Sequence, residues 1–142
     1  MRYNKLIPEL YVRDMEASLA FYKTCGFTVA YDRPETGFAF IERGEIQMML
    51  QEMPGTSEWG PEELPYPAGE GLNFQLEVEN MQEVYEACVS KGFSVFHEPC
   101  EEWYRQGELL LGNREFLIRD PDGYLLRFFK DLGEKPAAED AE

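Results

Sequence analysis

The feature that most constrains the fold of this sequence is an internal repeat with an offset of 66 residues. Residues 12–29, VRDMEASLAFYKTCGFTV, align without a gap with residues 78–95, VENMQEVYEACVSKGFSV. The matching positions are Val12/Val78, Asp14/Asn80, Met15/Met81, Gly26/Gly92, Phe27/Phe93 and Val29/Val95. A repeat at a fixed offset indicates that one supersecondary unit occurs twice. The chain of 142 residues is therefore expected to contain two similar modules.

Each copy of the repeat predicts a strand followed by a helix. The strands are expected over 6–12 and 72–78, and each ends close to an Asx residue that can cap a helix. Apolar residues then recur at helical spacing until a glycine, Gly26 or Gly92, ends the helix.

Three further strands are expected after each helix. They cover 27–33, 38–42 and 46–52 in the first module and 94–97, 115–119 and 124–130 in the second. Tight turns at 43–44 and 121–123 connect the last two strands of each module. The sequence thus predicts an α+β fold of two βαβββ modules, at 1–52 and 71–131.

Three segments do not fit this pattern. Residues 53–70 hold four prolines and three glycines, which predicts a linker between the modules. Residues 98–113 are polar and aromatic without clear periodicity, and we expect a lid loop over a site there. Residues 132–142 are acidic, which predicts a disordered tail.

The charge balance narrows the class of partner. The chain has 13 basic and 28 acidic residues, a net charge of −15, which argues against binding to nucleic acid or to an anionic membrane surface. The excess of acidic residues favours a cationic partner, or serves only to keep the protein soluble.

No apolar run resembles a signal peptide or a membrane span, and Cys25, Cys88 and Cys100 show no CxxC spacing. A cytoplasmic protein with free, buried thiols is expected.

Few residues could carry catalysis. His97 is the only histidine, so the chain cannot form a two-histidine metal site. Any Ser-His-Asp or Cys-His arrangement would have to use His97. No phosphate-binding glycine motif occurs, and the paired glutamates at 62–63 and 101–102 are expected to be solvated. The sequence predicts no catalytic residue, no metal and no cofactor.

Two tryptophans are candidates for ligand contact. Most aromatic residues are expected in the core, but Trp59 and Trp103 lie in polar segments where an indole has little core to join. Such an indole can stack on a planar or cationic ligand, or can be buried in a subunit interface. Both interpretations stay open at this point.

The sequence resembles the vicinal oxygen chelate superfamily in four features. These are the two βαβββ modules, RDMEASLAFY at 13–22, the GF pair after each helix and DPDGYLLRF at 120–128. That superfamily includes glyoxalase I, extradiol dioxygenases and the bleomycin-resistance proteins, and the resemblance covers about residues 5–130. It implies cup-shaped, mixed half-sheets. Enzymes of this superfamily hold a divalent metal at four inward strand positions, which fall here near Ile7, Gln51 or Glu52, Asn73 and Arg127. Arginine keeps its proton and repels a cation, so this set does not predict a metal site.

Within that superfamily the sequence looks most like the bleomycin-resistance branch, on IPELYVRD at 7–14 and DPDG-x-LLR at 120–127. That likeness implies a non-catalytic homodimer that sequesters a cationic glycopeptide antibiotic in clefts at its interface. The lid, EEWYRQG at 101–107, and the linker depart from the branch, which leaves the ligand open. The expected ligand contacts are Phe38, Phe40, Trp103, Tyr104 and Arg127, together with Trp59 contributed across the interface.

Two alternatives remain. One is a metal-dependent lyase or dioxygenase of the same fold with Glu9, Glu52 and His97 as atypical ligands. The other is a metabolite-sensing or purely structural module. Arg127 has two corresponding interpretations, since it could face a ligand or simply pair with a neighbouring glutamate.

Overall fold

The computed structural model describes residues 1–55 and 58–140, and the chain forms two compact units. Unit 1 comprises Met1–Gly71 together with Asp120–Tyr124. Unit 2 comprises Leu72–Arg119 and Leu125–Glu142. A five-residue segment from late in the sequence therefore packs as part of the first unit.

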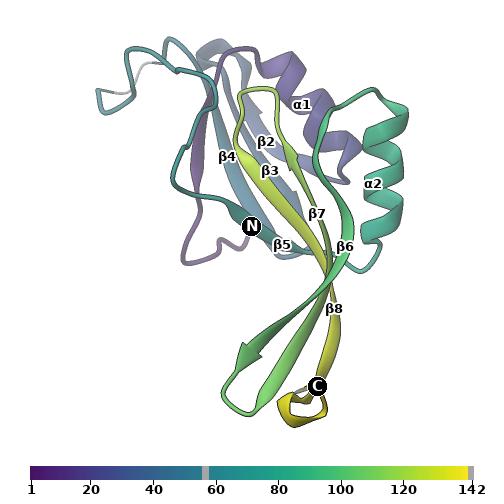
Figure 1. Cartoon of the computed structure of the whole chain (residues 1–142). Helices are drawn as coiled ribbons and strands as arrows, with labels where there is room; N and C mark the ends of the chain where they lie inside the picture. The colour runs from purple at the N-terminus through teal and green to yellow at the C-terminus, as the bar shows by residue number, and fades with distance from the viewer. Residues whose placement is uncertain (56–57, 141–142) are drawn as a thin grey trace. The chain divides into compact units, whose positions relative to one another are not determined.

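Unit 1 is a four-stranded mixed sheet with one helix (Figure 1). Its elements are β1 (Glu9–Val12), α1 (Met15–Thr24), β2 (Thr28–Arg33), the 3-10 turn η1 (Pro34–Thr36), β3 (Phe38–Arg43) and β4 (Ile46–Glu52). The strand order is β1-β4-β3-β2, in which β1 runs parallel to β4 and the other pairs are antiparallel. Asp14 caps α1, because its carboxylate accepts a hydrogen bond from the N–H of Ala17 at 3.2 Å.

Unit 2 repeats the same plan. Its elements are β5 (Phe74–Glu77), α2 (Met81–Ser90), β6 (Val95–Gln106), β7 (Leu109–Arg119), β8 (Leu125–Pro136) and the 3-10 turn η2 (Ala137–Asp140). The strand order β5-β8-β7-β6 is the order of unit 1 shifted by four strands, with β5 parallel to β8. The prediction of an α+β fold with two βαβββ modules is confirmed, although β1 and β5 are shorter than expected.

In both units the helix covers one apolar face of its sheet. In unit 2, Phe116 of β7 stacks on Phe128 of β8 and meets Tyr85 of α2 edge-on, and both phenylalanines are fully buried. Because side chains alternate along a strand, Arg127 and Phe129 lie on the opposite face of the sheet. That face carries the candidate ligand-binding site.

The prediction of a lid loop at 98–113 was wrong. These residues lie in β6 and β7, which pair from Cys100 to Leu109 around a turn at Gly107 and extend away from α2 as a ribbon (Figure 1). The predicted disorder of 132–142 was also wrong for its described part, because β8 pairs with β7 as far as Pro136 and η2 follows; residues 141–142 lie outside the described residues. The outer strand β6 and the end of β8 are largely exposed and polar here, so no apolar alternation reveals them as strands.

The segment 53–70 has neither helix nor strand among its described residues, as its composition suggested. It nevertheless packs within unit 1. Ala68 is buried, and its N–H donates to the carbonyl oxygen of Asp122 at 2.9 Å. At Gly123, whose φ is +101°, a Cβ atom would lie 2.5 Å from the Cα atom of Pro67, so only glycine fits there.

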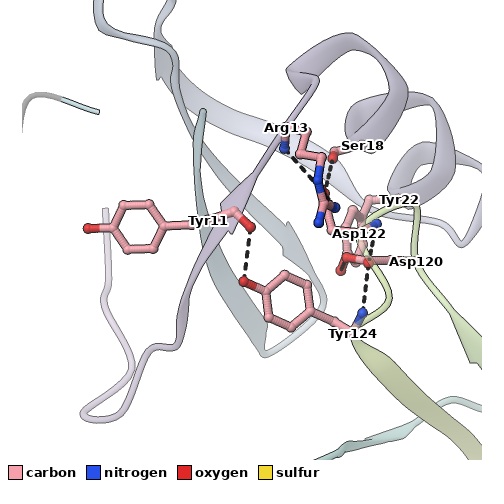
Figure 2. Close-up of polar contacts among 7 residues, drawn as sticks. All are labelled: Tyr11, Arg13, Ser18, Tyr22, Asp120, Asp122 and Tyr124. Carbon is pink, nitrogen blue, oxygen red and sulfur yellow. Dashed lines mark hydrogen bonds and ion pairs between the residues drawn. The ribbon is translucent and has the colours of Figure 1, made fainter. Parts of the chain in front are cut away.

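The turn at 120–124 is held by two buried carboxylates (Figure 2). Asp120 accepts hydrogen bonds from the N–H groups of Asp122 (2.9 Å) and Tyr124 (3.0 Å) and from the hydroxyl of Tyr22 (2.7 Å). Asp122 accepts from the backbone N–H of Arg13 at 3.0 Å and forms an ion pair with its guanidinium at 2.8 Å. Asp120 thereby satisfies two backbone donors of the turn itself, and Asp122 ties the turn to Arg13.

Two further predictions concerned buried free thiols and the absence of a membrane span. Cys25 and Cys88 are buried and free, as predicted, whereas Cys100 is half-buried. Among the described residues, α1 and α2 have ten residues each, and no helix has the length and hydrophobicity of a membrane-spanning segment.

The carboxyl of Asp120 should make stability depend on pH. Burial raises its pKa to about 6 and outweighs the hydrogen bond from Tyr22, which lowers the pKa. Because the folded state binds this proton more tightly than the unfolded state, the contribution is favourable below pH 4 and is lost as the pH rises through 6. Relative to Asp120→Asn, the wild-type protein should lose on the order of 2 kcal/mol of unfolding free energy between pH 4 and pH 7.

Urea unfolding of both proteins across this range measures the difference, in which the other carboxylates cancel. A difference between the two proteins that stays constant with pH would contradict the assignment.

Candidate ligand-binding site

A groove of about 400 Å³ lies on the face of the unit 2 sheet that is turned away from α2. All four strands and the bend at Gly133 contribute to it. Its lining residues are Gln75, Glu77, Tyr104, Leu111, Asn113, Phe129, Asp131, Gly133 and Glu134. The backbone register explains the set, since Tyr104 pairs with Leu111 and Leu111 pairs with Glu134.

The lining of the groove is aromatic and acidic. Tyr104 and Phe129 supply two rings, and Glu77, Asp131 and Glu134 supply three carboxylates, whereas no lysine or arginine is among the lining residues. Asp131 accepts a hydrogen bond from the N–H of Gly133 at 2.7 Å. Aromatic faces beside negative charges attract planar and cationic groups.

Arg127 forms a compact cluster with two residues beside the groove. Its guanidinium Nη2 atom donates to Oε1 of Glu115 at 3.3 Å and to the hydroxyl of Tyr104 at 3.4 Å. The Tyr104 hydroxyl in turn donates to Oε2 of Glu115 at 3.1 Å. Burial and this hydrogen bond raise the pKa of the Tyr104 phenol. The prediction that Arg127 pairs with a neighbouring glutamate is confirmed, whereas ligand contact by Arg127 and by Tyr104 stays a prediction.

Trp103 lies on the other face of the ribbon from Tyr104, as consecutive strand residues must. Its ring covers Gly112, where an added Cβ atom would lie 2.6 Å from the indole. The Nζ atom of Lys135 lies 4.1 Å from the ring centroid, and the indole N–H donates to Glu101 at 2.9 Å. The structure therefore places Tyr104 in the groove and Trp103 outside it. Ligand contact by Trp103 stays a prediction.

The remaining predicted contacts belong to unit 1. Phe38 and Phe40 are buried, at 4% and 1% exposure. Tyr31 stacks on Phe40 with ring centroids 5.1 Å apart, and the guanidinium of Arg33 lies 4.0 Å from the Phe38 ring centroid. Trp59 is 80% exposed in the 53–70 segment. Ligand contact by these three residues stays a prediction.

Sequence reasoning missed Glu115, Phe129 and the groove carboxylates. A signal for part of this set was present, because Arg127, Phe129 and Asp131 lie at every second position and must share one face of a strand. Glu115 and Glu134 could not be placed in the same way, since their position depends on the strand pairing.

A model of one protein family matches residues 6–128, most of the chain. The chain belongs to the glyoxalase/bleomycin resistance protein/dioxygenase superfamily. The resemblance inferred from the sequence motifs is therefore confirmed at the level of the superfamily.

Individual members of the superfamily are also similar. A bleomycin resistance protein of Klebsiella pneumoniae is 25% identical over 132 residues, which cover 87% of this chain and 90% of that protein. One from Geobacillus stearothermophilus is 27% identical over 138 residues, covering 89% and 96%. Among solved structures, a bleomycin-binding protein complexed with bleomycin has a TM-score of 0.57 at 23% identity, covering 90% of this chain and 98% of that one, a likeness of fold.

The four superfamily metal positions do not fit a divalent cation here. Arg127 is already paired with Glu115, and the side-chain amide of Gln51 donates to the carbonyl oxygen of Thr36 at 2.7 Å. The carboxylate of Glu52 accepts the N–H of Met15, the first residue of α1, at 2.7 Å. Side chains that are neutral, positively charged or already hydrogen-bonded within the protein make a poor ligand set for a divalent cation. Within residues 1–55 and 58–140, no three histidine, cysteine, aspartate or glutamate side chains gather as a metal would require.

Removal of the Arg127 guanidinium should destabilise the protein. Glu115 is 5% exposed, and without its partner it would be a buried, uncompensated charge. We expect Arg127→Met to lower the free energy of unfolding by about 2 kcal/mol. The double variant Arg127→Met/Glu115→Met should recover most of that loss, because it removes both charges together.

Urea unfolding measures both effects, with Arg105→Met on exposed β6 as the control, expected to change stability by less than about 0.5 kcal/mol. A double variant that is as unstable as the sum of both single variants would show that the pair is not coupled.

Proposed function

We propose that this protein binds a small, cationic, amphipathic molecule in the groove of unit 2 and does not transform it chemically. The observation that carries the proposal is the groove itself, which combines two aromatic rings with three carboxylates and has no basic residue in its lining. A cation placed there would meet complementary charge, and its planar parts would meet the rings of Tyr104 and Phe129.

The superfamily relatives suggest which molecule to test first. Two of them are bleomycin resistance proteins that match nearly the full chain. Bleomycin is a cationic glycopeptide with planar groups, so its chemistry suits the groove. We therefore propose a bleomycin-like ligand.

The net charge of −15 supports the same choice at longer range, because it would raise the local concentration of a cation near the protein.

The proposal includes a cytoplasmic homodimer in which a cleft at the subunit interface completes the site. Trp59 and Trp103 are suited to such a cleft because each presents an indole outside the core, one in the 53–70 segment and one on the ribbon. Sedimentation of the purified protein tests the assembly. The mass of a single chain at micromolar concentration would remove the dimer from the proposal.

Calorimetric titration with copper-free bleomycin tests the function directly. We expect saturable binding that weakens as salt is added, since charge contributes to it. The variants Glu77→Gln, Asp131→Asn and Glu134→Gln should each weaken binding about two- to fivefold, as expected for one partly solvated charge. Glu86→Gln on α2 removes the same charge far from the groove lining and should leave the affinity unchanged.

Three results would contradict the proposal. One is an absence of heat with wild-type protein at high concentration. Another is bleomycin recovered with an altered mass after incubation, which would show catalysis. The third is a stoichiometric divalent metal in protein purified without chelators, which would favour the alternative of a metal-dependent lyase or dioxygenase.

A further inference from the structure

Tyr104 lies on an exposed edge of the unit 2 sheet, where the strand itself does little to restrain the orientation of its ring. It is 41% exposed and lies on β6, the edge strand of the sheet, within the ribbon that extends away from α2. The residues next to it, Trp103 and Arg105, point to the other face. An exposed tyrosine on an edge strand normally samples several side-chain rotamers.

The hydroxyl of Tyr104 is nevertheless held at two points. It donates to Glu115 at 3.1 Å and accepts from Arg127 at 3.4 Å. Glu115 comes from β7 and Arg127 from β8, so the two partners lie on the central strands of the sheet. Both are better anchored than Tyr104, because Glu115 is buried and Arg127 is bound to it.

We propose that the Glu115–Arg127 ion pair is a positioning device that fixes the Tyr104 ring as the wall of the ligand groove. This inference rests on the proposed function and assigns to the pair a role in affinity and specificity. A ring fixed before the ligand arrives loses less conformational freedom on binding, and favours flat ligands that fit its orientation. The pair itself is electrically neutral, so the charge of the groove is left to Glu77, Asp131 and Glu134.

Two other roles of the ion pair would have different consequences. If Glu115 attracted the ligand cation directly, its removal would weaken binding whether or not Tyr104 has a hydroxyl. If the pair served only to stabilise the fold, its removal would lower the free energy of unfolding without changing the affinity of the folded protein. A double-mutant cycle with a variant that keeps the net charge constant separates these roles.

The test uses Tyr104→Phe, the charge-neutral variant Glu115→Met/Arg127→Met and the combined triple variant, each titrated with copper-free bleomycin. We expect Tyr104→Phe and the charge-neutral variant each to weaken binding about fivefold, the equivalent of one hydrogen bond. The triple variant should bind no more weakly than either, because all three proteins have lost the same restraint. The free energy of unfolding is measured alongside, so that affinity is compared among folded proteins.

Tyr85→Phe provides a matched control. The hydroxyl of Tyr85 also donates to a glutamate of unit 2, Glu98, at 2.7 Å, but Tyr85 belongs to α2 on the other face of the sheet. Its loss should leave the affinity for bleomycin unchanged.

A spectroscopic measurement reports on the restraint without ligand. The difference between the phenolate absorbance titrations of wild-type protein and Tyr104→Phe gives the pKa of Tyr104, which burial and Glu115 raise above its ordinary value. The same difference in the Glu115→Met/Arg127→Met background should lie closer to the ordinary value of about 10. An unchanged pKa would show that Glu115 does not hold the hydroxyl, and would overturn the inference.

The calorimetric outcomes are equally decisive. Wild-type affinity in both Tyr104→Phe and the charge-neutral variant overturns this inference and leaves the proposed function standing. Further weakening in the triple variant also overturns it, in favour of separate roles for the two sites. Absence of binding by the wild-type protein overturns the proposed function, and this inference with it.

Discussion

Two buried carboxylates set the geometry on which the candidate site depends. Asp120 and Asp122 hold the turn between β7 and β8 through backbone and side-chain hydrogen bonds. A turn that is fixed in this way also fixes the phase of the strand that follows it, because side chains alternate with a period of two. From Leu125 onward, each residue of β8 is thereby assigned to one face of the sheet. A slip of one residue would exchange the two faces.

The phase of β8 decides both the core and the groove of unit 2. Leu126 and Phe128 are placed in the apolar layer on the α2 side, where both are fully buried. Arg127, Phe129 and Asp131 are placed on the opposite face. There Arg127 compensates the buried charge of Glu115, and the other two residues line the groove. A single alternating strand thus supplies a hydrophobic layer, a buried ion pair and a ligand-facing surface.

Features of the fold that depend on local chemistry could be predicted from the sequence. The repeat, the glycines that end both helices and the Asx residue that caps α1 are each expressed within a few residues. The ribbon of β6, β7 and β8 could not, because its segments show no regular apolar alternation and are stabilised by pairing with one another across the sheet. The same limitation explains why 132–136 was expected to be disordered. Those residues complete the ladder with 109–112, which nothing in their own composition indicates.

The candidate site, like the fold, could be predicted from the sequence only in part. The sequence directed attention to Arg127 and Tyr104, and the structure brings both to Glu115. It did not separate Tyr104 from Trp103, although neighbours in a strand must face opposite ways. That step required knowing that 98–106 is a strand. The sequence could not place Glu77 and Glu134 beside Asp131 either, because these carboxylates come together only through the pairing of β5, β7 and β8.

Nuclear magnetic resonance would show directly whether bleomycin binds in the groove of unit 2. Backbone amide shifts of the labelled chain would be followed as copper-free bleomycin is added. We expect the largest changes on the groove strands, at residues such as Gln75, Tyr104 and Phe129. Large changes on α1 and α2, with none along the groove, would contradict this expectation.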